Sequence, residues 1–83
     1  MKKTRQQGTA RNVIGDRVRR ARLQAQPPIS QEDLAGRLAA LGIAIDQAAL
    51  SRVERGERYV LDYEAQALAK SLKVRVAWLF REN

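Results

Sequence analysis

The sequence has 83 residues, of which 45% are hydrophobic, which is enough for one domain with one modest core. It contains no cysteine and no histidine, so a disulfide framework is excluded and a zinc site or a Ser-His-Asp triad lacks its usual residues. No apolar run approaches the roughly 18 to 20 residues that span a bilayer, and no apolar stretch follows Met1-Lys2-Lys3 to complete a signal peptide. We therefore expect a cytoplasmic protein that binds no metal ion.

The net charge of +7 is concentrated at the N-terminus. The first 22 residues carry eight basic residues and one acid, whereas the remaining residues carry eight of each sign. A polyanionic partner would explain a basic segment of this kind, and a solvated basic surface is the simpler alternative. We expect this segment to grip a nucleic-acid backbone.

Two regions are expected along the chain. Residues 1–11 show no apolar periodicity, which predicts a flexible basic N-terminal arm. Residues 12–83 show helical periodicity without strand-like alternation, internal repeats or low-complexity tracts. They are expected to form one all-α domain of five helices.

The first helix is expected over about 12–26 and ends before Pro27-Pro28. Its inward face consists of Ile14, Val18, Ala21 and Ala25. The second helix begins at Ser30, whose hydroxyl can accept a hydrogen bond from a first-turn amide, and Gly42 can end it in a left-handed conformation. Its buried residues are expected to be Leu34, Ala35, Leu38 and Leu41.

An apolar connector over 43–45 leads to Asp46, the expected N-cap of a third helix over about 47–55. Leu50 and Val53 face inward, and Gly56 closes this helix. A fourth helix is expected after its cap, Asp62. Its inward stripe consists of Ala65, Leu68, Ala69 and Leu72. A short final helix over 76–80 either completes the core, with Leu79 as the best candidate, or supplies a two-fold contact.

Two separated motifs carry a family resemblance. Ser-Gln-Glu-Asp-Leu-Ala at 30–35, followed by Leu-Ser-Arg-Val-Glu-Arg-Gly at 50–56, resembles the lambda-repressor/Cro-like (xenobiotic-response-element-type) helix-turn-helix family. The first helix at 14–19 and the fourth at 68–72 are similar to that family as well. The resemblance implies a compact five-helix DNA-binding domain and a transcriptional regulator, with a repressor expected first. The connection between the second and third helices is about five residues longer than the family's compact turn.

The resemblance places the base-reading residues on the third helix, which we expect to enter the major groove. They are Gln47, Ala48, Ala49, Ser51 and Arg52. Glutamine can pair bidentately with adenine and arginine with guanine, while the small alanines permit close approach and can sense a thymine methyl group. For Arg52, the simpler alternative is an exposed arginine that contacts only phosphate or water.

Phosphate contacts are expected around this helix. The resemblance places one of them at Gln31, at the start of the second helix, as a side-chain or backbone contact. For Gln31 the alternative is a solvent-exposed residue of the first turn. The others are expected from Arg11, Arg17, Arg55 and Arg58, for each of which solvated surface is the alternative. The family pattern also pairs Glu54, on the inner side of the third helix, with Arg22, and we interpret this pair as structural and partly buried.

Three other classes of function compete with DNA binding. An enzyme is the weakest class, because every acid serves as a cap, a pair or surface and no glycine-rich loop could cradle a cofactor. An antitoxin or protein-bridging module of the same fold is the main alternative, and it would expose an apolar patch near Trp78 and Phe80 of the C-terminal helix to a protein partner. RNA binding ranks third, because no exposed aromatic cluster is expected to stack unpaired bases.

We therefore expect a homodimer on double-stranded DNA, with half-sites about 34 Å apart, and no contact with a membrane. Tyr59 and Tyr63 either add to the dimer contact or cover the edge of the core.

Overall fold

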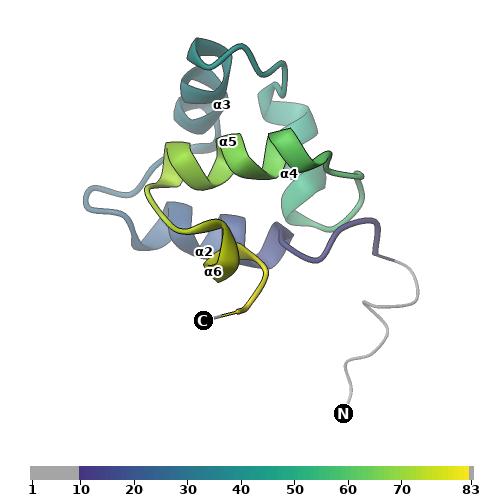
Figure 1. Cartoon of the computed structure of the whole chain (residues 1–83). Helices are drawn as coiled ribbons and strands as arrows, with labels where there is room; N and C mark the ends of the chain where they lie inside the picture. Colours follow the sequence, from purple (N-terminus) through teal and green to yellow (C-terminus); the bar gives the residue numbers. More distant parts are fainter. Residues whose placement is uncertain (1–9, 83) are drawn as a thin grey trace.

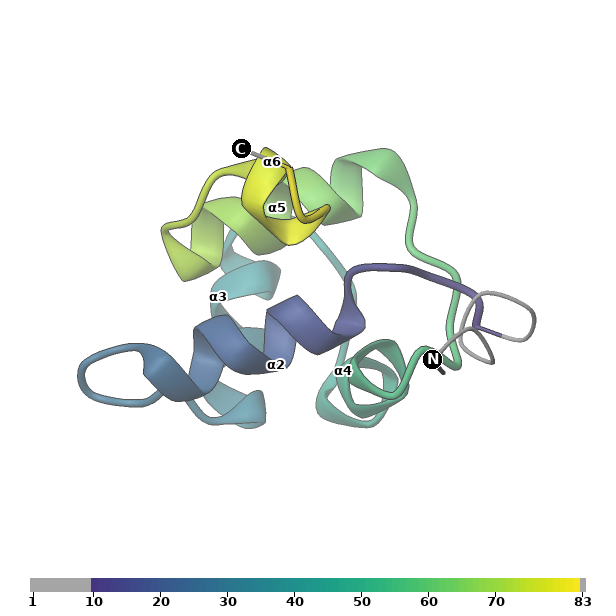
Figure 2. The same cartoon turned by 90° about the horizontal axis from the view of Figure 1, so that it is seen from below.

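A computed structural model describes residues 10–82, which form five helices and no strand. They are α2 (Gly15–Gln24), α3 (Gln31–Ala40), α4 (Gln47–Glu54), α5 (Asp62–Leu72) and α6 (Val76–Leu79). Helix α3 packs against α4 and α5, while α2 packs against α4, α5 and α6 (Figures 1 and 2). The predicted all-α class is confirmed. Residues 1–9, most of the predicted arm, lie outside the described residues.

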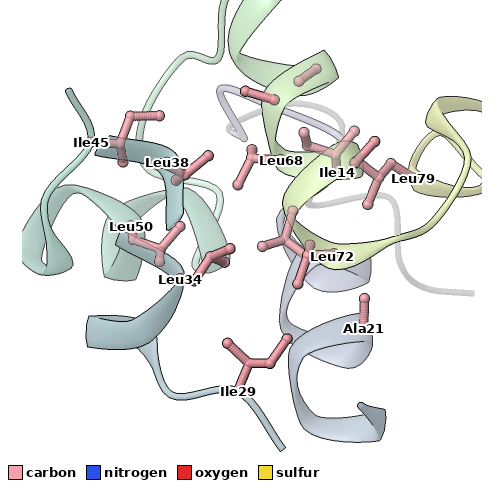
Figure 3. Close-up of a cluster of buried hydrophobic side chains, with 14 of the residues drawn as sticks. Ile14, Ala21, Ile29, Leu34, Leu38, Ile45, Leu50, Leu68, Leu72 and Leu79 are labelled. Carbon is pink, nitrogen blue, oxygen red and sulfur yellow. The ribbon is translucent and has the colours of Figure 1, made fainter. Parts of the chain in front are cut away.

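The core is a cluster of aliphatic side chains from all five helices and from the connector between α3 and α4 (Figure 3). Its largest fully buried members are Ile14, Leu34, Leu38, Ile45, Leu50, Leu68, Leu79, Val18 and Val53. Burying one aliphatic side chain of this size contributes about 1.5 to 3 kcal/mol to folding. The predicted inward stripe of α5 is buried throughout, and Leu79 anchors the short α6 to the core.

Four predicted helix boundaries are confirmed. The Ser30 hydroxyl accepts a hydrogen bond from the Asp33 amide at 2.9 Å, and the Asp46 carboxylate accepts one from the Ala49 amide at 2.8 Å. Gly42, with φ of 80°, and Gly56, with φ of 76°, hold the left-handed conformation just beyond α3 and α4. Asp46 and Gly56 therefore fix the two ends of α4, the helix that is expected to enter the major groove.

The predicted start of the first helix is wrong by three residues. Asn12 lies before α2, because its Oδ1 accepts hydrogen bonds from the amides of Ile14 and Gly15 at 3.0 and 2.7 Å. Helix α2 therefore begins at Gly15 and ends at Gln24, two residues short of the predicted end.

Two further predictions about helix ends are wrong. Leu41 is 41% exposed, because α3 ends at Ala40 and the chain folds back through a hydrogen bond from the Ile43 amide to the Leu38 carbonyl. That reversal brings Ile45 into the core instead. Asp62 is the first residue of α5 rather than its cap.

Among residues 10–82, no helix combines the length and the apolar character that crossing a membrane would require.

Candidate nucleic-acid interface

Helix α4 presents the surface that the sequence assigns to base reading. Leu50 and Val53 point into the core and are fully buried. On the opposite side, Gln47, Ala48 and Arg52 are exposed and Ser51 is half-buried. The outer face of α4 therefore offers an amide, a methyl group and a guanidinium to a partner.

Ala49 does not belong to this outer face. It is 8% exposed and packs in the core cluster, one helical turn before Val53 on the inward side. The prediction that Ala49 reads a base is therefore wrong, and Ala48 is the alanine that remains accessible. The helical period could have separated the two alanines, because Ala49 is four residues before the inward-facing Val53 and Ala48 is not.

A shielded ion pair joins α4 to α2. The Arg22 guanidinium donates through Nε to Oε2 of Glu54 at 2.7 Å and through Nη2 to Oε1 at 2.9 Å. The side chains are only 10% and 4% exposed, and Nη1 of Arg22 also donates to the Ile29 carbonyl at 3.0 Å. A bidentate contact of this geometry holds the two helices in one relative orientation.

Gln31 takes part in the same network. Its side-chain Nε2 donates to Oε1 of Glu54 at 3.1 Å, so the amide is turned toward the ion pair. A phosphate contact at this position would therefore use the backbone amide of Gln31, at the start of α3, or would require the side chain to leave Glu54.

Asn12 is a positioning residue that the sequence analysis missed. Besides capping α2, its Nδ2 donates to the carbonyls of Val53 at 3.1 Å and Arg58 at 2.9 Å. The adjacent Arg11 amide donates to the Gly56 carbonyl at 2.8 Å, so the start of the domain runs beside the turn that follows α4 (Figure 2). An asparagine just before an apolar-periodic run is a recognised N-cap signal, but nothing in the sequence indicates the two carbonyls across the fold.

The four predicted phosphate-binding arginines differ in their surroundings. The guanidinium of Arg17 stacks on the Trp78 ring at 4.5 Å and donates to the Trp78 carbonyl. Arg58 pairs with Glu64 at 3.1 Å. These two side chains hold the fold together, whereas Arg55 is exposed beside Glu57, and Arg11 is exposed with its guanidinium 5.8 Å from the centre of the Tyr59 ring.

The acidic side chain of α4 does not lie on the outer face of the helix. Glu54 is the one acid of the helix, and its carboxylate is turned inward to Arg22. Within residues 10–82, no carboxylate lies within ion-pair distance of Arg52. The outer face of α4 therefore carries the positive charge of Arg52 without an acid of the same helix beside it.

The Glu64 carboxyl should make stability depend on acid pH. Burial raises its pKa, but hydrogen bonds from Arg58 and the Leu61 amide, together with the charge of Arg58, lower the pKa below its ordinary value of 4.5. Because the folded-state pKa is depressed, the stabilisation is complete above the unfolded-state value and disappears as the pH falls through the folded-state value. We predict that the difference in unfolding free energy between the wild type and Glu64→Gln shrinks below pH 4.5. Urea unfolding at a series of pH values measures it, and a constant difference would contradict the prediction.

Comparisons with family models, with curated proteins and with solved structures find no match to this chain. In the part of the chain that the structure describes, no group of three or more carboxylates is placed to hold a metal ion.

Proposed function

We propose that this protein binds double-stranded DNA in a sequence-specific manner and regulates transcription, with repression as the expected outcome. In this proposal the domain has the lambda-repressor-like arrangement, and α4 lies in the major groove. The observation that carries the proposal is the outer face of α4, where Gln47, Ala48 and Arg52 are exposed on a helix whose only acid points inward.

The rigid mounting of α4 supports the same function. Direct readout requires that a few side chains reach base edges with hydrogen-bond geometry, so the helix that carries them must not rotate. Here the Arg22–Glu54 pair holds the C-terminal end of α4 against α2, and the Asp46 cap fixes the N-terminal end of α4.

Selection of bound duplexes from a random pool tests the proposal. We expect enrichment of a pseudo-palindromic sequence with half-sites one helical turn, about 34 Å, apart, because two copies related by a two-fold axis would each place one α4 in the groove. Absence of any enriched sequence would contradict sequence-specific binding.

Arg52 gives the sharper test of base reading. We predict that Arg52→Ala removes discrimination at one position of each half-site, at a cost of about 1 to 3 kcal/mol for the preferred base pair. Arg75→Ala is the matched control, because Arg75 is also an exposed arginine but lies at the N-cap of α6, away from α4. Competition binding with single-base variants of the selected site measures both. A uniform loss across all variants would assign Arg52 to a phosphate instead.

A protein-bridging or antitoxin role remains the second candidate, and one feature favours it. A shallow groove of about 460 Å³ lies between α3 and the connector to α4. Six of its lining residues are small or apolar and could contact an apolar side chain of another protein, while Glu32, Asp46 and Gln47 add polar groups. This groove, rather than the C-terminal helix, is the surface to test if the duplex selection enriches nothing.

A further inference from the structure

Four exposed apolar side chains lie on two neighbouring segments, residues 11–13 and 58–63, which together we call the 59–63 corner. They are Val13, Tyr59, Leu61 and Tyr63, with exposed fractions of 64%, 69%, 51% and 55%. The hydrogen bond from Asn12 to the Arg58 carbonyl and the stacking of Arg11 on Tyr59 bring the start of the domain to this loop. Exposed apolar side chains on neighbouring segments mark interaction sites more often than scattered ones do.

The C-terminal helix offers less free apolar surface. Leu79 is fully buried, and Trp78 is half-buried beneath the Arg17 guanidinium. Only Val76 and Phe80 remain exposed, at 39% and 42%. Helix α6 is thus mainly occupied in closing the core.

The charges at the 59–63 corner favour a second copy of this chain as the occupant. Arg11 stands over Tyr59, and Asp62 lies between Leu61 and Tyr63 in the sequence. Neither has an ion-pair partner among residues 10–82. In an isologous two-fold contact every pairing occurs twice, so an Arg11–Asp62 pair across the contact would be made by both copies. One unpaired charge of each sign therefore allows the surface to be self-complementary.

Other exposed apolar surface lacks this property. Leu23 is 45% exposed on α2, but its neighbours Arg19 and Arg20 are both exposed as well. Two copies that met there would bring like charges together, which opposes association.

We infer that the protein forms a two-fold homodimer through the 59–63 corner, with Arg11 of each copy facing Asp62 of the other. The corner adjoins the C-terminal end of α4. On the proposed function, on which this role rests, a dimer through the corner would set the spacing of the two recognition helices. The dimer itself does not depend on DNA, so it can be tested without any duplex.

Sedimentation velocity of the full chain over a range of concentrations tests the interface. We expect Leu61→Glu to raise the dimer dissociation constant at least tenfold, since it places a charge in the centre of the contact, whereas Leu23→Glu leaves the constant unchanged. Both side chains are exposed, so both variants should keep the far-UV circular dichroism spectrum of the wild type. Arg11→Glu and Asp62→Arg should each weaken the dimer, and combining them should restore it, because the pair is then reversed.

Three results would overturn the inference. One is a wild-type chain that stays monomeric at every concentration, and another is a double charge reversal that weakens the dimer as much as its two single changes together. The third is loss of the dimer in Phe80→Glu with no effect of Leu61→Glu, which would assign the contact to α6. Failure of this interface and failure of the proposed function are distinguishable. A chain that stays monomeric would remove the reason for a palindromic site but not for enrichment of a specific sequence, and the other two results do not bear on the duplex selection.

Discussion

Replacement of Glu54 by alanine is expected to lower the free energy of unfolding by about 3 to 5 kcal/mol. The reason is the shielding of Arg22, whose side chain is 10% exposed and would lose both of its carboxylate contacts while its charge stays in place. Gln31 would lose its partner as well. Because small domains are stable by only about 5 to 15 kcal/mol, this variant should be close to unfolding at elevated temperature.

An exposed ion pair gives the control for this experiment. Arg81 and Asp16 lie 3.2 Å apart with side chains that are 56% and 68% exposed, so Arg81→Ala should change the stability by no more than about 0.5 kcal/mol. Replacing both buried partners, Arg22→Met with Glu54→Leu, should recover most of the loss, because no charge is then stranded. Urea unfolding measures all three proteins. If Glu54→Ala costs as little as Arg81→Ala, the pair is not shielded from water.

The fold was largely predictable because its signals are local. Ser30 and Asp46 cap the helices that they precede, and Gly42 and Gly56 take the left-handed conformation that ends a helix. Each of these roles depends on residues within one helical turn, which a sequence shows directly. The apolar stripe of α5 follows from the helical period in the same way.

The candidate site was less predictable because its details depend on distant contacts. Ala49 lies on the core side of α4 and Ala48 is exposed, as the helical period implies, but the family resemblance assigns both alanines to base reading. The side chain of Arg17 is held by Trp78, more than 60 residues further along the chain. Asn12 joins carbonyls from two other segments. Such pairings are decided by the tertiary fold, so composition and periodicity could identify the outer face of α4 but not which arginines stay free.

The exposed basic residues of the N-terminal segment and the proposed base-reading residues lie on different helices. Arg19 and Arg20 are exposed on α2, whereas the outer face of α4 carries Arg52 and uncharged polar or small groups. In the proposed function, the basic N-terminal segment would supply affinity that falls steeply with salt, and α4 would supply discrimination that depends far less on salt.

Gly15→Ala is expected to destabilise the protein by about 3 kcal/mol, at the upper end of what overpacking costs. A Cβ atom at Gly15 would overlap the carbonyl oxygen of Val53 and come within 3.0 Å of that of Glu54. Both neighbours are backbone atoms at the end of α4, so relief requires the two helices to move apart. Because Gly15 lies in α2 without a positive φ, alanine suits its conformation, and the whole loss would come from this contact.

Gly36→Ala is the matched control for the same substitution. Gly36 is exposed within α3 and nothing lies within 4 Å of a Cβ atom there, so alanine should stabilise the protein by about 0.5 to 1 kcal/mol through its higher helix propensity. Thermal unfolding should therefore move in opposite directions for the two variants. If both raise the midpoint, α2 and α4 do not approach as closely as this contact requires. If Gly15→Ala is folded at low temperature, its affinity for the selected duplex should fall below that of Gly36→Ala, because a shift of α4 away from α2 changes how its outer face meets the groove.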